Sequence, residues 1–166
     1  MSDTKTDTSN PELLVKEKLD ELISFRNSTE SMHEFWAKQY DLGLAWVQFP
    51  TGSGGLDLNP NFQLMINETL RKEGISINNR IANILGIGMG APTIAEFGTE
   101  EQKNKYLRPM FAAEEIWCQM FSEPGSGSDL ASLSTKAVDD GDGYIVNGQK
   151  VWTTLGHLAK WGLLVA

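Results

Sequence analysis

The spacing of apolar positions along the chain changes near residue 114. Before that point apolar side chains recur every three or four residues, as they do on one face of a helix. After it, short runs rich in β-branched and aromatic residues alternate with turn residues, which is typical of strands. The pattern predicts an α+β protein with a helical domain over residues 1–113 and the start of a β-domain over residues 114–166.

Four local signals mark where the expected helices begin. They are Asn10-Pro11, Ser31 with Glu34, Asn59-Pro60, and Thr99 with Gln102. The two Asn-Pro pairs place a capping side chain before a proline at the first helical position. The other two pairs match the capping box. Between them, the segment 75–98 is apolar on most faces, so we expect a buried helix there.

Four short runs are expected to be strands. They cover residues 116–122, 133–138, 144–154 and 161–166. Asp139 to Gly143 is a turn signal, and Asn147-Gly148 is expected to form a tight hairpin turn. The last run ends as an uncapped apolar strand, an edge that natural proteins usually cover. We therefore expect a β-domain that is cut short.

Composition narrows the classes of function. The 166 residues carry a net charge of −8, which disfavours nucleic-acid binding because that draws on clustered Lys and Arg. The single cysteine, Cys118, excludes a disulfide within the chain, and two isolated histidines indicate no metal site. No apolar run reaches the roughly 20 residues of a membrane-spanning helix. The expected location is the cytoplasm.

The most unusual stretch is SEPGSGSDLAS at residues 122–132. It fails as a dinucleotide fingerprint, because Leu130 stands where a third glycine is needed. From the residues alone two interpretations stay open. One is a plain surface loop. The other is an anion nest, in which successive backbone amides and hydroxyls converge on a phosphate.

Several motifs around this stretch occur together in one family. Residues 121–129 follow the signature hydrophobic-Ser/Thr-Glu-Pro-x-x-Gly-Ser-Asp, and residues 141–144, 147–150 and 151–154 follow the next strands at the expected spacing. Upstream, residues 97–103 match the helix before the β-domain. The sequence thus resembles the acyl-CoA dehydrogenase family, in which a C-terminal helical bundle follows the β-barrel-like middle domain.

The resemblance implies an FAD site and a role for each matching residue. Ser122 would donate to the pyrimidine edge of the flavin, Trp152 would pack against the ring, and Thr154 would donate to N5. Gly127 and Ser128 would approach the pyrophosphate, and Ser128 would also touch the CoA substrate. The residues expected at the cofactor are Gln119, Met120, Phe121, Ser122, Gly127, Ser128, Trp152, Thr153 and Thr154.

The resemblance also implies a reaction, the α,β-dehydrogenation of acyl-CoA thioesters to trans-2-enoyl-CoA in fatty-acid or related catabolism. Electrons would pass to an electron-transferring flavoprotein, and the full-length form would be a homo- or hetero-oligomer. The family's catalytic base lies in the C-terminal domain, so residues 1–166 alone are expected to be inactive. Two alternatives stay open: a flavin oxidase or monooxygenase acting on a non-CoA substrate, and a non-catalytic flavin-binding split subunit.

Overall fold

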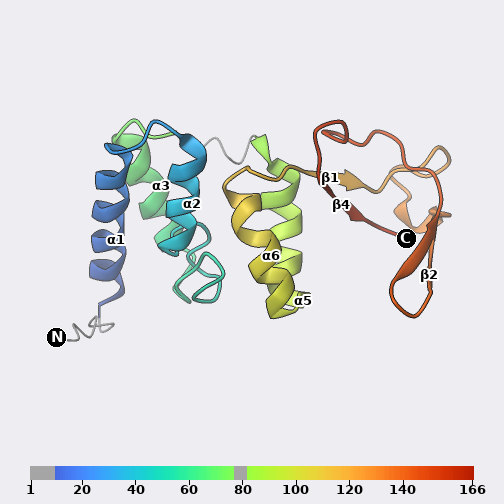
Figure 1. Ribbon diagram of the computed structural model, residues 1–166, viewed down its shortest axis with the longest axis horizontal. Helices are drawn as coiled ribbons and strands as arrows, with labels where there is room; N and C mark the ends of the chain where they lie inside the picture. The colour runs from blue at the N-terminus through green and yellow to red at the C-terminus, as the bar shows by residue number, and fades with distance from the viewer. Residues whose placement is uncertain (1–9, 77–81) are drawn as a thin grey trace. The chain divides into compact units, whose positions relative to one another are not determined.

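The computed structural model describes residues 10–76 and 82–166, and the chain divides into two compact units, Met1–Glu114 and Glu115–Ala166. The first unit contains the α-helices, and the second contains the strands and a short 3-10 helix, η2 (Leu130–Ser132) (Figure 1). The predicted succession of a helical part and a β part is confirmed. Within the described ranges, no helix combines the length and the apolar character that crossing a membrane requires.

Six helical segments make up the described part of the first unit. They are α1 (Pro11–Arg26), α2 (Met32–Asp41), α3 (Phe62–Lys72), the π-helical turn η1 (Gly86–Gly90), α5 (Ala91–Phe97) and α6 (Glu100–Phe111). Helix α1 contacts α2 and α3, and α6 contacts α2, α5 and η1. The contacts therefore run without a break from α3 through α1, α2 and α6 to α5 and η1.

Three of the four predicted helix starts are correct. The Asn10 carboxamide accepts hydrogen bonds from the amides of Glu12 and Leu13. Thr99 and Gln102 form a complete capping box, with bonds of 3.2 and 2.8 Å. Ser31 forms only half of a box, because it accepts from the Glu34 amide while the Glu34 carboxylate accepts from the Thr29 hydroxyl.

The fourth start is displaced. Helix α3 begins at Phe62 rather than directly after Asn59, because the Asn59 carboxamide accepts from the Asn61 amide at 2.9 Å. That bond closes a turn two residues long, which precedes the helix. The Asn-Pro signal therefore marks a turn that leads into the helix, and not the helix cap itself.

An aromatic cluster forms the centre of the first unit. Trp46 packs edge-on against Phe111 at 4.9 Å, stacks on Phe49 at 5.0 Å, and meets Tyr40 at 6.2 Å between ring centroids. Phe35, from α2, is completely buried. Because the cluster joins the loop after α2 to α6, it fixes the helix that leads into the second unit.

The prediction of a buried helix over residues 75–98 is only partly correct. Residues 77–81 lie outside the described residues. In the remainder, Gly86 and Ile87 are buried, but Ile84 is 58% exposed and Phe97 is 82% exposed. A Cβ at Gly86 would lie 2.9 Å from Met110 Cγ, so close packing on α6 is confined to one face of the segment.

The second unit has two separate two-stranded sheets. Strand β1 (Trp117–Met120) pairs in parallel with β4 (Trp161–Leu164), and β2 (Lys136–Asp139) pairs antiparallel with β3 (Tyr144–Asn147). The turn predicted between residues 139 and 143 is present, closed by the bond from the Asp140 amide to the Gly143 carbonyl at 3.0 Å.

The hairpin predicted at Asn147-Gly148 is wrong. β3 ends at Asn147, and the described residues 148–154 form no strand. Gly148 has a packing role instead, since a Cβ there would lie 2.1 Å from the Thr135 hydroxyl oxygen. The glycine lets the chain leaving β3 pass directly over the residue that precedes β2.

The capping box of α6 provides a test of the helical unit. Thr99→Ala removes a side chain that accepts from the Gln102 amide, so we expect a loss of about 1 kcal/mol of unfolding free energy in urea titrations. Asn61→Ala is the matched control, because the described Asn61 side chain makes no capping bond at the start of α3. Its effect should stay within about 0.5 kcal/mol. Equal losses in both variants would contradict this assignment.

Candidate functional site

A small pocket lies where β1 ends. It encloses about 90 Å³ and is lined by Gln119, Phe121, Ser122, Val151, Trp152 and Thr154. The two sides of the pocket are separated by almost thirty residues, and a hydrogen bond from the Val151 amide to the Ser122 carbonyl joins them at 2.9 Å. One wall is the exit of β1, and the other is the segment 151–154.

The pleat of β1 decides which side chains face the pocket. Successive side chains of a strand point to opposite faces, so Gln119 and Phe121 share one face. Cys118 and Met120 share the other face, where a Cβ at Gly162 of β4 would lie 2.3 Å from Met120 Cε and 3.3 Å from Cys118 Sγ. Met120 therefore packs against β4 and does not line the pocket.

Trp152, in the second wall, combines an unusual backbone conformation with an exposed side chain. Its φ of 57° is left-handed, and 89% of the residue is exposed. A bulky residue in this conformation carries roughly 1–3 kcal/mol of strain. An exposed indole gains nothing from burial that would offset this strain. The pocket thus has a large aromatic surface at its rim, open to any planar ligand.

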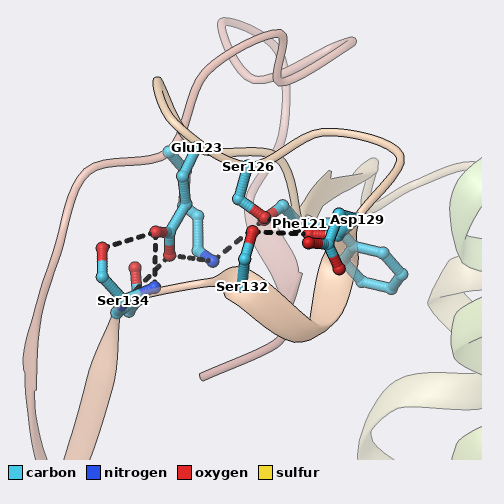
Figure 2. A network of polar contacts seen from close by, with 8 residues as sticks. Phe121, Glu123, Ser126, Asp129, Ser132 and Ser134 are labelled. Atoms are coloured by element: carbon cyan, nitrogen blue, oxygen red, sulfur yellow. Dashed lines mark hydrogen bonds and ion pairs between the residues drawn. The ribbon is translucent and has the colours of Figure 1, made fainter.

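The glycine-rich loop begins with a closed turn. The Glu123 amide donates to the Ser126 carbonyl at 2.7 Å, and the Ser126 amide donates back to the Glu123 carbonyl at 3.1 Å. Asp129 contributes its backbone carbonyl to the same loop. That carbonyl accepts from the hydroxyls of Ser126 at 2.6 Å and Ser132 at 2.9 Å (Figure 2).

The anion that this region encloses is the protein's own Glu123 carboxylate. One oxygen accepts from the amide and the hydroxyl of Ser134, both at 2.7 Å. The other accepts from the Thr135 amide and from Lys150 Nζ, both at 2.9 Å (Figure 2). The Glu123 side chain is 4% exposed and that of Lys150 is 9% exposed, so the ion pair is buried.

This network changes the acidity of Glu123. The hydrogen bond from Lys150, followed by those from Thr135 and Ser134, holds the pKa of the Glu123 carboxyl well below its ordinary value of 4.5. A carboxylate held so firmly in its charged form is a poor proton acceptor. Glu123 is therefore a structural anion and not a candidate general base.

The sequence singles out the loop that contains Glu123 but does not identify Lys150 as the partner of this carboxylate. Lys150 lies 27 positions away, beyond any helix or hairpin spacing that would indicate a pair. The only available signal was chemical: a buried carboxylate requires a cation or several donors. Nothing in the local sequence around Lys150 identifies it as that cation.

Five of the predicted cofactor residues line the pocket together. They are Gln119, Phe121, Ser122, Trp152 and Thr154. Gly127 and Ser128 lie exposed in the loop, outside the pocket lining. Thr153 is half-buried, and its carbonyl accepts from the Gly156 amide at 3.0 Å. The structure therefore brings together five of the nine residues predicted at the cofactor, whereas Met120 and Thr153 lie outside the pocket lining and Gly127 and Ser128 lie in the exposed loop.

Comparison with known proteins identifies the family. Residues 12–114 match the N-terminal domain of acyl-CoA dehydrogenases, and residues 118–166 match the middle domain. The chain belongs to the acyl-CoA dehydrogenase family. Relatives in this family are FAD-dependent flavoproteins. The match to the middle domain includes all the residues that line the 90 Å³ pocket.

Individual acyl-CoA dehydrogenase relatives agree with this assignment. The acyl-CoA dehydrogenase FadE34 of Mycobacterium tuberculosis is 42% identical over 126 residues, which are 76% of this chain and 17% of that protein. The solved ChsE4–ChsE5 complex of the same organism superposes with a TM-score of 0.58 at 32% identity over 96% of this chain and 43% of the other.

A third relative is named for a different activity. The prolyl acyl carrier protein oxidase AnaB superposes with a TM-score of 0.61 at 28% identity, over 95% of this chain and 44% of that one. The chain thus spans less than half the length of each of these three proteins. The similarity covers the helical domain and the part of the middle domain that carries the pocket.

Close packing around Glu123 generates one prediction. In Gly148→Ala the new methyl group would collide with Thr135, whose amide holds Glu123, so we expect a loss of about 1–3 kcal/mol of unfolding free energy. Gly125→Ala is the control, since a Cβ there meets no described atom within 4 Å. Chemical denaturation of both variants measures the difference. If the two unfold at the same denaturant concentration, the contact between Gly148 and Thr135 is not tight.

The lowered pKa of Glu123 generates a pH dependence. Because the folded-state pKa lies below the unfolded value, the network stabilises the fold above about pH 4.5, and this stabilisation is lost as the pH falls toward the folded-state pKa. Glu123→Gln should lower the melting temperature at neutral pH and flatten its decline from about pH 5 to about pH 2. Thermal unfolding followed by circular dichroism tests this. Asp142→Asn, in the exposed turn after β2, should keep the parent profile.

Proposed function

We propose that this chain supplies the flavin-ring side of an FAD site in an enzyme that dehydrogenates acyl-CoA thioesters. The observation that carries the proposal is the convergence of five residues, predicted for the flavin ring from their motifs, around a single pocket. These residues come from two segments far apart in the sequence. Their meeting at one place is a property of the fold and not of either motif alone.

The size and chemistry of the pocket fit one edge of the cofactor. Sites that enclose a whole ligand usually measure about 300–1,000 Å³, so 90 Å³ accommodates part of a ring rather than a dinucleotide. Donors at the pocket include the hydroxyls of Ser122 and Thr154 and the carboxamide of Gln119, and the exposed indole of Trp152 offers a stacking face. Planar heterocycles with polar edges require this combination.

The chain's own residues would bind and orient, while FAD supplies the acceptor for hydride. Ser122 would hold the pyrimidine edge with its hydroxyl, Thr154 would donate to the ring's central nitrogen, and Trp152 would exclude water from one face. Glu123 is already engaged by four donors, so we assign the α-proton to a base outside the described residues. In the family that base lies in the C-terminal domain.

The partners follow from the same assignment. We propose an acyl-CoA substrate, an electron-transferring flavoprotein as electron acceptor, and assembly with a second subunit, in line with the two-protein ChsE4–ChsE5 complex. Gly127 and Ser128 lie exposed in the middle of the loop, where they are accessible to the phosphates of FAD or to the CoA arm. We propose the cytoplasm as the location.

A second candidate function is an oxidase that acts on an acyl group carried by a protein. The observation that favours it is the likeness to AnaB, whose name states an oxidase acting on a prolyl acyl carrier protein. The two candidates differ in their electron acceptor. Turnover that requires an electron-transferring flavoprotein or a dye supports the dehydrogenase, whereas stoichiometric consumption of oxygen with peroxide release supports the oxidase.

The flavin assignment predicts two distinct effects, which should be measured in the FAD-bound protein. Ser122→Ala should lower the reduction potential of bound FAD, because a hydrogen bond to the charged reduced state contributes roughly 1.5–3 kcal/mol, about one to two decades in the equilibrium constant. Thr154→Val should slow flavin reduction by substrate more than it lowers FAD occupancy. Dye equilibration measures the potential, and visible absorbance measures occupancy and the rate of reduction.

Thr93→Val is the matched control, because the Thr93 hydroxyl donates to the Met89 carbonyl in the other unit and Thr93 does not line the pocket. It should leave potential, rate and occupancy close to the parent values. If the protein binds no FAD, the proposed function is wrong. If FAD binds but Ser122→Ala and Thr154→Val behave as the control does, the pocket is not the place where the ring sits.

A further inference from the structure

The buried ion pair between Glu123 and Lys150 lies directly behind the pocket. Lys150 Nζ donates to the Phe121 carbonyl at 3.0 Å as well as to Glu123 at 2.9 Å. The next residue, Val151, donates its amide to the Ser122 carbonyl. Three consecutive residues of the first wall, 121–123, are therefore bonded to two consecutive residues of the second, 150 and 151.

The same carboxylate fixes a third segment. Ser134 and Thr135, which precede β2, donate three hydrogen bonds to Glu123 through two backbone amides and one hydroxyl. The β1 exit, the approach to β2 and the chain leaving β3 thus meet at one carboxylate. A buried charge that satisfies four donors at once holds its neighbours in a single arrangement more firmly than surface bonds would.

We propose that the Glu123–Lys150 ion pair positions the two walls of the flavin pocket, and that its paired charges set the electrostatic potential at the pyrimidine edge of the flavin. This inference rests on the proposed function, because it takes the pocket as the flavin site. Neither residue lines the pocket, so both are positioning residues and act through Phe121, Ser122 and Val151.

The charges of Glu123 and Lys150 should shift the reduction potential of the flavin in opposite directions, which a purely structural ion pair would not do. The reduced flavin carries negative charge toward its pyrimidine edge, so nearby positive charge favours reduction and nearby negative charge opposes it. In the intact pair the two charges offset each other. Glu123→Gln leaves the Lys150 ammonium uncompensated, which should raise the potential. Lys150→Met leaves the Glu123 carboxylate uncompensated, which should lower it.

The test measures the reduction potential of bound FAD in the parent protein and in four variants. We expect Glu123→Gln to lie above the parent and Lys150→Met below it, each by about tenfold in the reduction equilibrium constant, which is about 30 mV for a two-electron couple. Lys150→Arg keeps the charge and should stay near the parent. Lys160→Met is the matched control, because Lys160 pairs with Glu115 in the same unit through an exposed side chain.

A second measurement needs no flavin. In Lys150→Met, hydrogen exchange at the Val151 amide should accelerate at least tenfold relative to the parent, since the neighbouring tie to Phe121 is lost. In Lys160→Met it should not change. If Lys150→Met fails to fold, the other two variants test the inference. The reduction potential of FAD must be higher than the parent's in Glu123→Gln and must equal the parent's in Lys150→Arg.

Each contrary result has a distinct meaning. Potentials that shift in the same direction in both charge-removing variants, or that equal the parent's while the melting temperature falls, overturn the inference and leave a purely structural ion pair. In those cases the flavin assignment stands, because FAD is still bound. A parent protein that binds no FAD overturns the proposed function and the inference with it.

Discussion

The second unit depends on the burial of one carboxylate. Taking the Glu123 side chain out of water is unfavourable unless every oxygen finds donors, and the chain supplies them from Ser134, Thr135 and Lys150. Two sheets of two strands each have little apolar surface to bury, and all four residues of both β2 and β3 are exposed. Polar convergence on Glu123, rather than a large apolar core, therefore fixes how the loops around β1 and β3 meet.

This arrangement links stability to ligand geometry. Glu123 directly follows the pocket residues Phe121 and Ser122, and its partner Lys150 directly precedes the pocket residue Val151. A change that loosens the ion pair therefore moves the pocket walls directly. The site needs no separate scaffold, because the network that closes the loop also sets the distance between the two walls.

The sequence predicted the features that are coded locally. Asn10 and Thr99 are correct caps because a cap involves residues two or three positions apart. Asn147-Gly148 was misread because its glycine serves a contact with Thr135, twelve or more positions away, and not a turn. The Glu123–Lys150 pair was missed for the same reason. The pocket was predicted through the motifs of a resembling family, since no local pattern joins residues 122 and 151.

Four glycines of the second unit fall into two groups that physical argument separates. Gly148 and Gly162 are required by neighbours, since a Cβ at either would lie within 2.3 Å of a side-chain atom. Gly125 and Gly127 have open space at the Cβ position among the described atoms and lack a left-handed φ. Glycine loses more conformational entropy on folding than alanine does, so Gly125 and Gly127 give the fold no advantage over alanine. What glycine does offer there is close approach of another molecule to the backbone. Such an approach is what the proposed position of Gly127 at the pyrophosphate of FAD would require.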